Sequence, residues 1–493
     1  MILSFFLSPY TLLLFPALYY LAPYLQRWYL HDIPAPFAAS FSNLWLMYQC
    51  RRGRRYRSVD NAHKKYGPLV RIQPHHVSVA DPEAIPIIYG HGNGFLKSEY
   101  YDAFVSIRRG LFNTRDRAEH SRKRKTVAHT FSARSIGQFE QYIHANLEEF
   151  VRQWNRISDL QHDPKTGYAS IDALHWFNYL AFDIIGDLAF GAPFGMLEKG
   201  QDVLNRRGEV SGTLGIFPDL KPWAKFLPDR FFRDGLEAVE ELAGIAVARV
   251  SERLRPEVMA NNTRVDLLAR LMEGRDENGA KLGREELTAE ALTQLIAGSD
   301  TTSNTSCAML YWVLKTPGVK EKLQQVLDEI IPADVEVPSY AMVKDIQYIS
   351  WVISETMRIH STSSLGLPRL IPEGAPPVKI HNHVFYAGTV LSVPSYTIHH
   401  STRIWGPDAE QFVPTRWDPA RLTSEQKAAF IPFSTGPRAC VGRNVAEMEL
   451  QCITATVFKN FDFELQQGGP LETREGFLRK PLQLHVGLKR RRA

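Results

Sequence analysis

The chain opens with a long uncharged stretch. Residues 1–26 contain no charged side chain, and a helix of that length could cross a hydrocarbon core of roughly 30 Å. Three prolines interrupt the stretch, although prolines are tolerated in membrane helices. Arginines follow at Arg27 and between residues 51 and 57. The pattern predicts a single membrane-spanning anchor helix over 1–26, and the positive-inside rule places the rest of the chain on the cytoplasmic side.

A cleaved signal peptide is the alternative interpretation of the same stretch. Signal peptides begin with a charged region and carry a shorter apolar core, and neither feature is present here. The pattern therefore favours an anchor in contact with membrane lipid. A linker over residues 27–45 follows it, stiffened by Pro34 and Pro36.

Beyond residue 45 the hydrophobic pattern is mainly helical. Helical periodicity dominates from residue 81 to about residue 330, and its longest segment is 289–314. Short β-like runs occupy four stretches, 69–73, 77–80, 378–393 and 461–486. We therefore predict a fold that is mainly α with a minor β portion.

Composition narrows the class of protein. A charged content of 23% and an apolar content of 44% are ordinary for a globular protein. The net charge of +5 is small for 493 residues, and no zinc-finger or RNA-binding signature is present, so no nucleic-acid partner is expected. The four cysteines are scattered, which favours a reducing compartment over a disulfide framework. For Cys50, Cys307 and Cys452 we expect buried structural positions.

The remaining cysteine lies in a loop with a specific pattern, Phe433-Ser-Thr-Gly436-Pro-Arg438-Ala-Cys440-Val-Gly442. A thiolate needs backbone N–H donors close by, and the two glycines let the backbone approach it. Arg438 presents a planar fork of donors that suits a carboxylate, and Phe433 would cover the sulfur side of a bound ring. All five positions match the haem-binding loop of the cytochrome P450 family, which the segment resembles.

This resemblance implies the cytochrome P450 fold and a haem-thiolate monooxygenase activity. The cofactor would be haem b, with Cys440 as the iron's protein ligand. An anionic sulfur ligand pushes electron density toward the iron and favours cleavage of the O–O bond.

A polar cluster interrupts the longest helical segment at Ala297-Gly298-Ser299-Asp300-Thr301-Thr302. A glycine and consecutive polar residues inside an apolar helix are locally unfavourable, which indicates a site. We expect Gly298 to leave room for dioxygen, Thr301 to offer a hydroxyl, and Asp300 to relay protons through water. The alternative is a kinked helix with a serine- and threonine-rich face. The hexapeptide is similar to the family's acid–alcohol motif, which implies catalytic roles for Asp300 and Thr301.

Two further segments are similar to the family's supporting network. Glu355 and Arg358 lie three positions apart and share one helix face, a spacing that alone is common on protein surfaces. Arg416 lies in the segment 412–417, which resembles the family's meander, although Thr415 replaces its usual glutamate. The resemblance implies a buried triad of Glu355, Arg358 and Arg416 that supports the cysteine loop. Loss of one member would leave a buried charge unpaired.

Haem carries two propionates, and the family binds them with basic residues. His120 and Arg124 lie four positions apart, so they share a helix face, as in the family's propionate-contacting helix. A solvated basic face is the alternative for the basic residues between and after them. Arg369 occupies the family's other propionate position. Because the signals from residue 120 to residue 442 concern one prosthetic group, we expect a single haem-binding catalytic domain over 46–493.

Within the family, the chain resembles the fungal benzoate para-hydroxylases from about residue 30 to residue 489. Long stretches carry this resemblance: 91–120, 177–197, 253–274 and 431–450. It implies 4-hydroxylation of benzoate, with NADPH electrons supplied by a reductase that carries FAD and FMN, at the endoplasmic reticulum membrane. One departure is a shorter segment at residues 197–203, just before the helices that cover the family's substrate channel.

The segment 100–109 supplies aromatic residues and two arginines for a substrate pocket. A benzoate anion in an apolar pocket needs a cation to offset its lost hydration. We expect Tyr101 and Phe104 to form walls and Arg108 or Arg109 to bind the carboxylate, which would turn the para C–H toward the oxidant. The alternatives are a monooxygenase of another small aromatic or secondary metabolite, and a haem-binding protein without turnover.

Overall fold

The computed structural model describes residues 18, 21–200, 207–261, 264–466 and 468–491. The predicted anchor over 1–26 falls mostly outside these residues, as does part of the shortened segment at 197–203. None of the helices in the described part of the chain is both long and apolar enough to span a bilayer.

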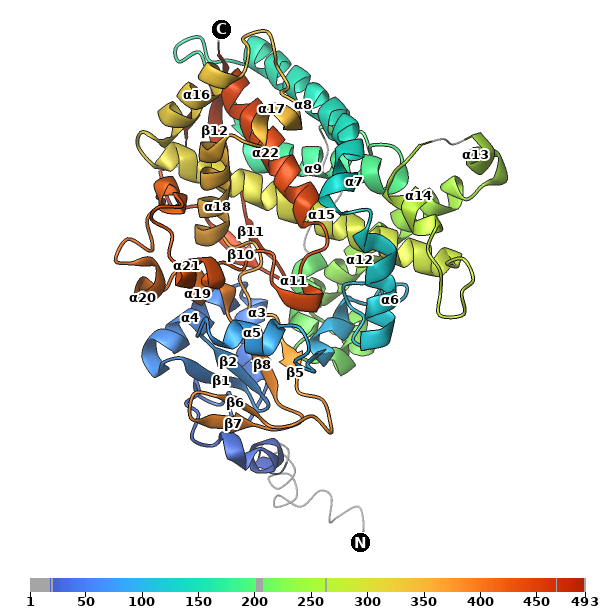
Figure 1. The fold of residues 1–493 in the computed structure, drawn as a ribbon, viewed down its shortest axis with the longest axis vertical. Coiled ribbons are helices and arrows are strands. Elements are labelled where there is room, and N and C mark those ends of the chain that lie inside the picture. The colour runs from blue at the N-terminus through green and yellow to red at the C-terminus, as the bar shows by residue number, and fades with distance from the viewer. Residues whose placement is uncertain (1–17, 19–20, 201–206, 262–263, 467, 492–493) are drawn as a thin grey trace.

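A large helical part and a smaller β-rich part make up the molecule (Figure 1). The β-rich part lies beside the N-terminus, and α15 crosses the middle of the helical part. The helices used below are α3 (Leu44–Arg51), α4 (Arg55–Tyr66), α5 (Ala84–Tyr89), α6 (Arg117–Ala128), α8 (Glu140–Leu160), α9 (Ala173–Phe190), α11 (Arg207–Leu214), α12 (Arg230–Arg253), α15 (Arg284–Lys315), α16 (Val319–Ile330), α18 (Gln347–Ile359), α21 (Ser424–Ala429) and α22 (Arg443–Asn460).

Shorter helices connect these elements. They are α7 (Ala133–Ile136), α10 (Met196–Lys199), α13 (Pro256–Asn261), α14 (Leu267–Met272), α17 (Tyr340–Val343), α19 (Ser395–His399), α20 (Thr402–Trp405), and the 3-10 helices η1 (Trp28–Leu30), η2 (Glu99–Phe104), η3 (Gly137–Phe139), η4 (Pro218–Phe226), η5 (Pro414–Trp417) and η6 (Gly436–Arg438).

The main sheet has the strand order β1-β2-β8-β5-β3, in which β2 and β8 are parallel and the other neighbours antiparallel. A three-stranded sheet has the order β4-β12-β9, and two further pairs are β6–β7 and β10–β11. The strands are β1 (Leu69–Gln73), β2 (His76–Val79), β3 (Leu96–Lys97), β4 (Ala169–Asp172), β5 (Arg369–Leu370), β6 (Val378–Ile380), β7 (His383–Phe385), β8 (Val390–Ser392), β9 (Phe461–Leu465), β10 (Thr473–Glu475), β11 (Arg479–Pro481) and β12 (His485–Arg490).

These elements confirm the predicted hairpin at residues 69–80, the long central helix and the helix that follows Cys440. Part of the stretch 27–45, which was expected to be a linker, packs against the main sheet. Leu30 and Ile33 are buried in the hydrophobic core of the main sheet, and the backbone N–H of Arg71 bonds the carbonyl oxygen of Pro34 at 2.9 Å. Residues 30–34 are therefore packed against the sheet, because their apolar side chains find a surface to cover there.

The largest core lies in the helical part and joins α8, α9, α15, α16, α18 and α22. Helix α15 packs most extensively against α9. Cys307 and Cys452 are buried in this core, and Cys50 is buried beside α4, as expected for structural cysteines.

Candidate active site

The cysteine loop connects α21 to α22 and is held by its own backbone. The N–H of Cys440 bonds the carbonyl oxygen of Phe433 at 2.9 Å. Gly436 has a φ of 72°, and a Cβ there would lie 1.8 Å from the carbonyl oxygen of Tyr89, at the end of α5. Only glycine fits this position, because any side chain would separate the loop from α5.

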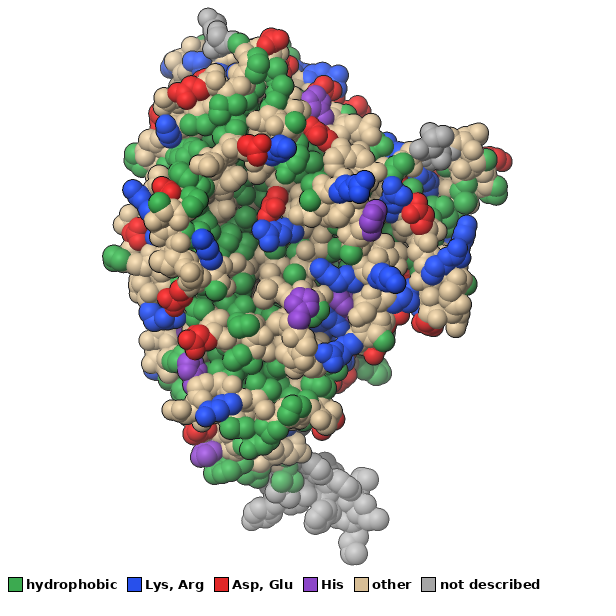
Figure 2. Space-filling view, viewed as in Figure 1, with side chains coloured by type: hydrophobic (Ala, Val, Ile, Leu, Met, Phe, Trp, Pro, Cys, Tyr) green, Lys and Arg blue, Asp and Glu red, His purple; other side chains and the backbone are tan. Residues whose placement is uncertain are grey.

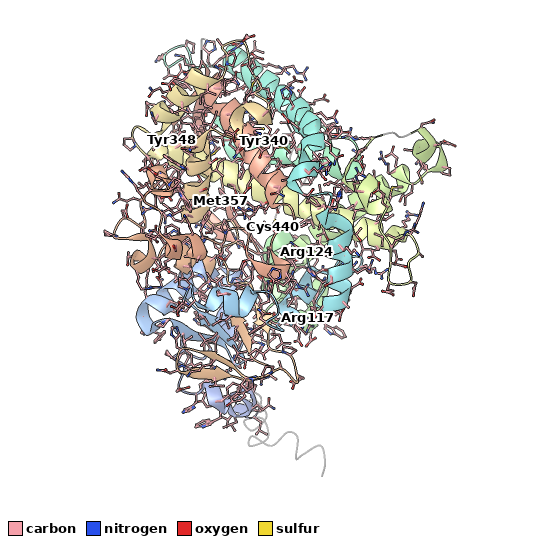
Figure 3. All side chains as sticks on the ribbon, in the orientation of Figure 1. Arg117, Arg124, Tyr340, Tyr348, Met357 and Cys440 are labelled. Atoms are coloured by element: carbon pink, nitrogen blue, oxygen red, sulfur yellow. The ribbon has the colours of Figure 1, made fainter. Side chains whose placement is uncertain are left out.

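The thiol of Cys440 lies inside the protein and still has free space beside it. Figure 3 shows Cys440 where the loop enters α22, with Arg124 of α6 beside it. The side chain of Cys440 is exposed, yet burial by the surrounding protein raises the pKa of the thiol. A backbone hydrogen bond from Gly442 and the charge of Arg124 act in the opposite direction and favour the thiolate. Cys440 is thus surrounded by protein and still keeps accessible surface of its own.

Helix α15 also borders internal space at its middle. Ala297 is exposed, although it lies at the centre of a helix buried on most sides. The hydroxyl of Thr301 donates to the carbonyl oxygen of Ala297 at 2.7 Å, so the two residues lie on one helix face, a turn apart. This face is the one that has room for a reactant.

Gly298 does not face that space, so its predicted role was wrong. A Cβ on Gly298 would lie 2.8 Å from Cδ1 of Ile185, on α9. The absence of a side chain therefore lets α15 and α9 pack closely. The room near Thr301 comes from Ala297 instead.

A cavity of about 1360 Å³, including its opening to solvent, lies along the same part of α15. Asp300 and Thr301 line it, together with Phe104 and Arg108 from the segment after β3. Most of its wall is aliphatic or aromatic, as in small-molecule sites generally. Asp300 lines the cavity without being an unpaired charge, because it also interacts with another group of the protein.

Tyr101 and Arg109, the other two residues predicted near the substrate, do not line this cavity. The hydroxyl of Tyr101 accepts a hydrogen bond from Arg369 at 2.9 Å. Arg109 binds the carboxylate of Asp102 at 2.6 Å. Their side chains are thus engaged with neighbouring protein groups.

Four cations gather around His120, which is buried. Burial and these four charges lower the pKa of His120 to about 3. They come from separate elements: Lys97 of β3, Arg124 of α6, Arg369 of β5 and Arg438 of η6. Within the described residues none of the four forms an ion pair, and their donors reach backbone carbonyls or a tyrosine hydroxyl.

Lys97 was missed by the sequence analysis. It lies directly opposite Arg369 in the β3–β5 ladder, where like charges destabilise the pair. Burial and the neighbouring arginines lower the pKa of Lys97. A single lysine in a two-residue strand has no sequence signal, and only the strand pairing reveals its place in the cluster.

These features fit a haem. The thiol of Cys440 is surrounded by protein and still accessible, which suits an iron ligand. The unpaired cations around His120 need anionic partners, and the two propionates of haem would supply them.

Glu355, Arg358 and Arg416 form one network at the C-terminal end of α18. Arg358 donates to both oxygens of Glu355 at 2.8 Å, and both side chains are fully buried. Nε of Arg416 lies 3.4 Å from Glu355, and the indole N–H of Trp417 donates to the same carboxylate at 3.0 Å.

This network reaches the cysteine loop through His399. Arg358 donates to the carbonyl oxygen of His399 at 2.8 Å. The ring of His399 in turn accepts the backbone N–H of Ile431 at 3.1 Å, two residues before Phe433. The ion network therefore fixes the start of the cysteine loop.

Comparison with known proteins gives a consistent assignment. The sequence profile of the family described as Cytochrome P450 matches residues 34–488. A benzoate 4-monooxygenase, bphA, of Aspergillus niger is 73% identical over 99% of both chains, and a second sequence of that name and species is 72% identical over the same shares. Tryprostatin B 6-hydroxylase of Neosartorya fischeri is 30% identical over 89% of this chain and 77% of its own. The family suggested by the cysteine loop is confirmed, and the chain belongs to the cytochrome P450 family.

Proposed function

We propose that this cytochrome P450 hydroxylates benzoate at the carbon para to its carboxylate. The observation that carries the proposal is the 73% identity to a benzoate 4-monooxygenase across essentially the whole chain. The cavity beside Asp300 and Thr301 supports it, because its mostly apolar wall suits an aromatic ring.

The protein is a haem-thiolate monooxygenase that uses O2 and electrons from NADPH, delivered by a reductase. When bound, the haem supplies the iron chemistry that activates dioxygen. We assign Cys440 as the iron's protein ligand, with Phe433, Gly436 and Gly442 shaping its loop. The propionate contacts would come from His120, Arg124, Arg369 and Arg438, and Lys97, whose charge also acts on His120, would join this set.

Asp300 and Thr301 are the proposed proton-handling residues. The hydroxyl of Thr301 donates to the carbonyl oxygen of Ala297, which leaves its oxygen able to accept a hydrogen bond from a proton donor in the cavity. The carboxylate of Asp300 lines the same cavity and can exchange protons with solvent. Together they would hold and move protons at the cavity wall.

We assign the Glu355–Arg358–Arg416 network a structural role, since its members bond one another and the carbonyl oxygen of His399, whose ring holds Ile431 at the start of the cysteine loop. We also propose a single catalytic domain over 46–493. The family profile, which covers residues 34–488, supports a single domain.

The reductase partner would bind near α6. Exposed basic residues lie on the face of the protein that carries α6, and Figure 2 shows Lys and Arg gathered over that region. They include Arg117, Lys125, Arg134 and Arg443. A basic face suits an acidic partner protein and would speed its association.

We further propose that the uncharged run over 1–26 anchors the protein in the endoplasmic reticulum membrane, with the catalytic domain in the cytoplasm. The absence of charge over 26 residues and the arginines that follow support this arrangement.

The direct test is product analysis. Purified protein, a NADPH-dependent reductase and benzoate should yield 4-hydroxybenzoate in proportion to NADPH consumed, measured by liquid chromatography and mass spectrometry. A different hydroxylated product from a panel of substituted benzoates would favour another aromatic substrate. NADPH consumption with no hydroxylated product from any of them would contradict the proposed function.

A Thr301→Val variant tests the proposed proton handling, because it removes the hydroxyl and keeps the shape of the side chain. We expect continued NADPH consumption with less product and more hydrogen peroxide, since proton delivery would be impaired.

A further inference from the structure

The charged side chains that line the substrate cavity differ in whether they already have a partner of opposite charge. Three cations contribute to its wall, Arg108, Arg474 and Lys480. An aromatic carboxylate in this mostly apolar space needs a cation that is free to pair with it, since an unpaired buried charge is costly. Which of the three is free can be determined from their contacts.

Two of the cations already have carboxylate partners. Arg474 lies 2.8 Å from the carboxylate of Glu209, which lines the same cavity. Arg108 lies 3.7 Å from the buried carboxylate of Glu286 and is nearly half exposed, at 45%. Solvent weakens the attraction of so exposed a cation for a ligand.

Lys480 is the third cation. It lies at the cavity wall and is less exposed than Arg108, and among the described residues its side chain makes no hydrogen bond or ion pair. An ammonium group in this position is available to an incoming anion.

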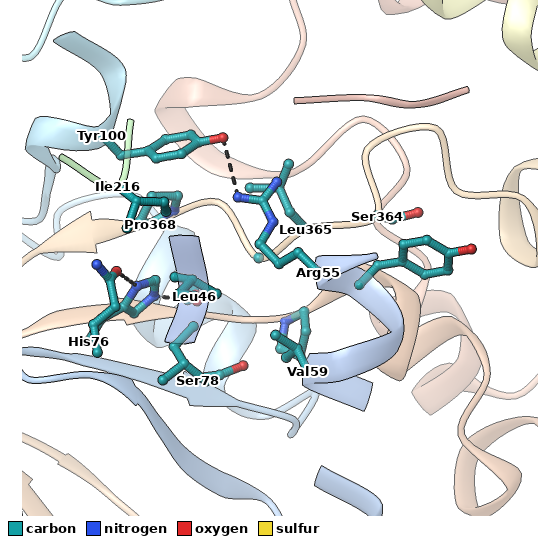
Figure 4. Close-up of a pocket in the computed structure, with 16 residues that line it drawn as sticks. Leu46, Arg55, Val59, His76, Ser78, Tyr100, Ile216, Ser364, Leu365 and Pro368 are labelled. Carbon is teal, nitrogen blue, oxygen red and sulfur yellow. Dashed lines mark hydrogen bonds between the residues drawn. The ribbon is translucent and has the colours of Figure 1, made fainter. Parts of the chain in front are cut away.

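The β10–β11 hairpin explains why Lys480 faces the cavity. Arg474 and Lys480 are directly opposite each other in its ladder, so they share one face, while their neighbours Glu475 and Arg479 share the other. Glu475 is engaged with Arg55 of α4 at 3.2 Å. Arg55 lines a separate, smaller cavity (Figure 4). The hairpin thus directs one pair of charges into the protein core and the other pair toward the substrate cavity.

The hairpin is also fixed relative to Thr301. The backbone N–H of Arg479, next to Lys480, bonds the carbonyl oxygen of Thr362 at 2.8 Å. The hydroxyl of Thr362 lies 3.2 Å from that of Thr305, and Thr305 donates to the carbonyl oxygen of Thr301 at 2.8 Å. The backbone beside Lys480 is therefore linked, through Thr362, to the turn of α15 that follows Thr301.

We propose that the ammonium group of Lys480 binds the carboxylate of the aromatic acid substrate. The inference rests on the proposed function and deepens it. Lys480, Ala297 and Thr301 line the same cavity, so a carboxylate held at β11 would leave the opposite end of the ring to reach the proton-handling residues. Lys480 thereby determines both the preference for an acid and the position of the reacting carbon.

The test is a spectral titration of the haem-loaded Lys480→Met variant with benzoate and with benzamide, a neutral molecule of nearly the same shape. Loss of a charge-assisted hydrogen bond should weaken benzoate binding about 10- to 100-fold. Benzamide binding should change less than about threefold, because it carries no charge. Lys480→Arg should recover most of the benzoate affinity.

The matched control is Lys379→Met, the same change on β6 outside the cavity, which should leave both affinities unaltered. Arg108→Met is the competing arm. If Arg108→Met weakens benzoate binding and Lys480→Met does not, the carboxylate belongs to Arg108 and the inference is overturned. Equal weakening of benzoate and benzamide in Lys480→Met would also overturn it, since that result indicates a change of shape alone.

Product analysis of the wild-type protein separates this inference from the proposed function. Conversion of benzoate to 4-hydroxybenzoate, with unchanged benzoate affinity in Lys480→Met, would overturn the role of Lys480 alone. Turnover of another aromatic acid whose affinity depends on Lys480 would support that role and overturn the benzoate assignment alone.

Discussion

Glu449 of α22 is a buried carboxyl group behind the active site. Its recorded partner is the hydroxyl of Thr302, which donates to it at 2.8 Å. Burial raises the pKa of Glu449 to about 7, and the hydrogen bond from Thr302 offsets this only in part. At the residue scale this group links the helix of the cysteine loop to the residue after Thr301.

The raised pKa predicts how stability changes with pH. The folded protein keeps the Glu449 proton up to about pH 7, whereas the unfolded chain loses it near its ordinary value of 4.5. Stability from this group is therefore fully present below pH 4.5 and is lost as pH rises through 7.

A Glu449→Gln variant should therefore match the wild type near pH 4.5 and exceed it at pH 8, by roughly 2 to 4 kcal/mol. Thermal unfolding of the haem-loaded proteins across this range measures the effect. Glu277→Gln, at an exposed loop position, is the control and should show no such trend. A difference from wild type that does not vary with pH would rule out titration of Glu449 in the folded protein.

Some functional residues could be predicted from the sequence and others could not. The five fixed positions around Cys440 identified the haem loop, because chemistry constrains each of them locally. Lys97 and Lys480 could not be found in this way. Each belongs to a short strand, and its neighbours are set by strand pairing with distant segments. The role of Gly298 was misassigned because the sequence does not show which face of α15 meets α9.

At the scale of elements, two adjacent residues of α15 have different roles: one packs against a neighbouring helix and the other borders the space for the reactants. Gly298 faces Ile185 of α9, with no room for a Cβ. Ala297 is exposed toward the internal space near Thr301. A larger residue at each position should therefore have a different consequence.

Gly298→Val should lower the thermal unfolding midpoint, because overpacking the α15–α9 contact costs about 1 to 3 kcal/mol. Ala297→Leu should leave the midpoint nearly unchanged and abolish the benzoate spectral shift, because its side chain fills reactant space. Calorimetry and spectral titration on both variants check the pair. The reverse result, with Gly298→Val blocking benzoate and Ala297→Leu unfolding the protein, would contradict the assigned faces.

Element boundaries followed from the sequence where periodicity was strong. The hairpin of β1 and β2 was predicted to within one residue and the helix α15 to within five, because alternation and helical spacing are local signals. The packing of Leu30 and Ile33 onto the sheet was not predicted. Their place depends on an apolar surface that forms only when distant strands come together.

At the scale of the whole molecule, separate segments converge on one prosthetic group. The cysteine loop, α6, β3, β5 and α15 all contribute residues to the candidate site, and the α18 network supports the loop from behind. Residues far apart in the sequence become neighbours here, all within the region 34–488 that the family profile covers. The account depends on the thiolate of Cys440 as the iron's protein ligand.

The carbon-monoxide difference spectrum of the reduced protein tests this claim most directly. Thiolate ligation by Cys440 predicts a strongly red-shifted Soret band that disappears in Cys440→Ser. A band at the position of histidine-ligated haem in the wild type, or a red-shifted band that persists in Cys440→Ser, would contradict it.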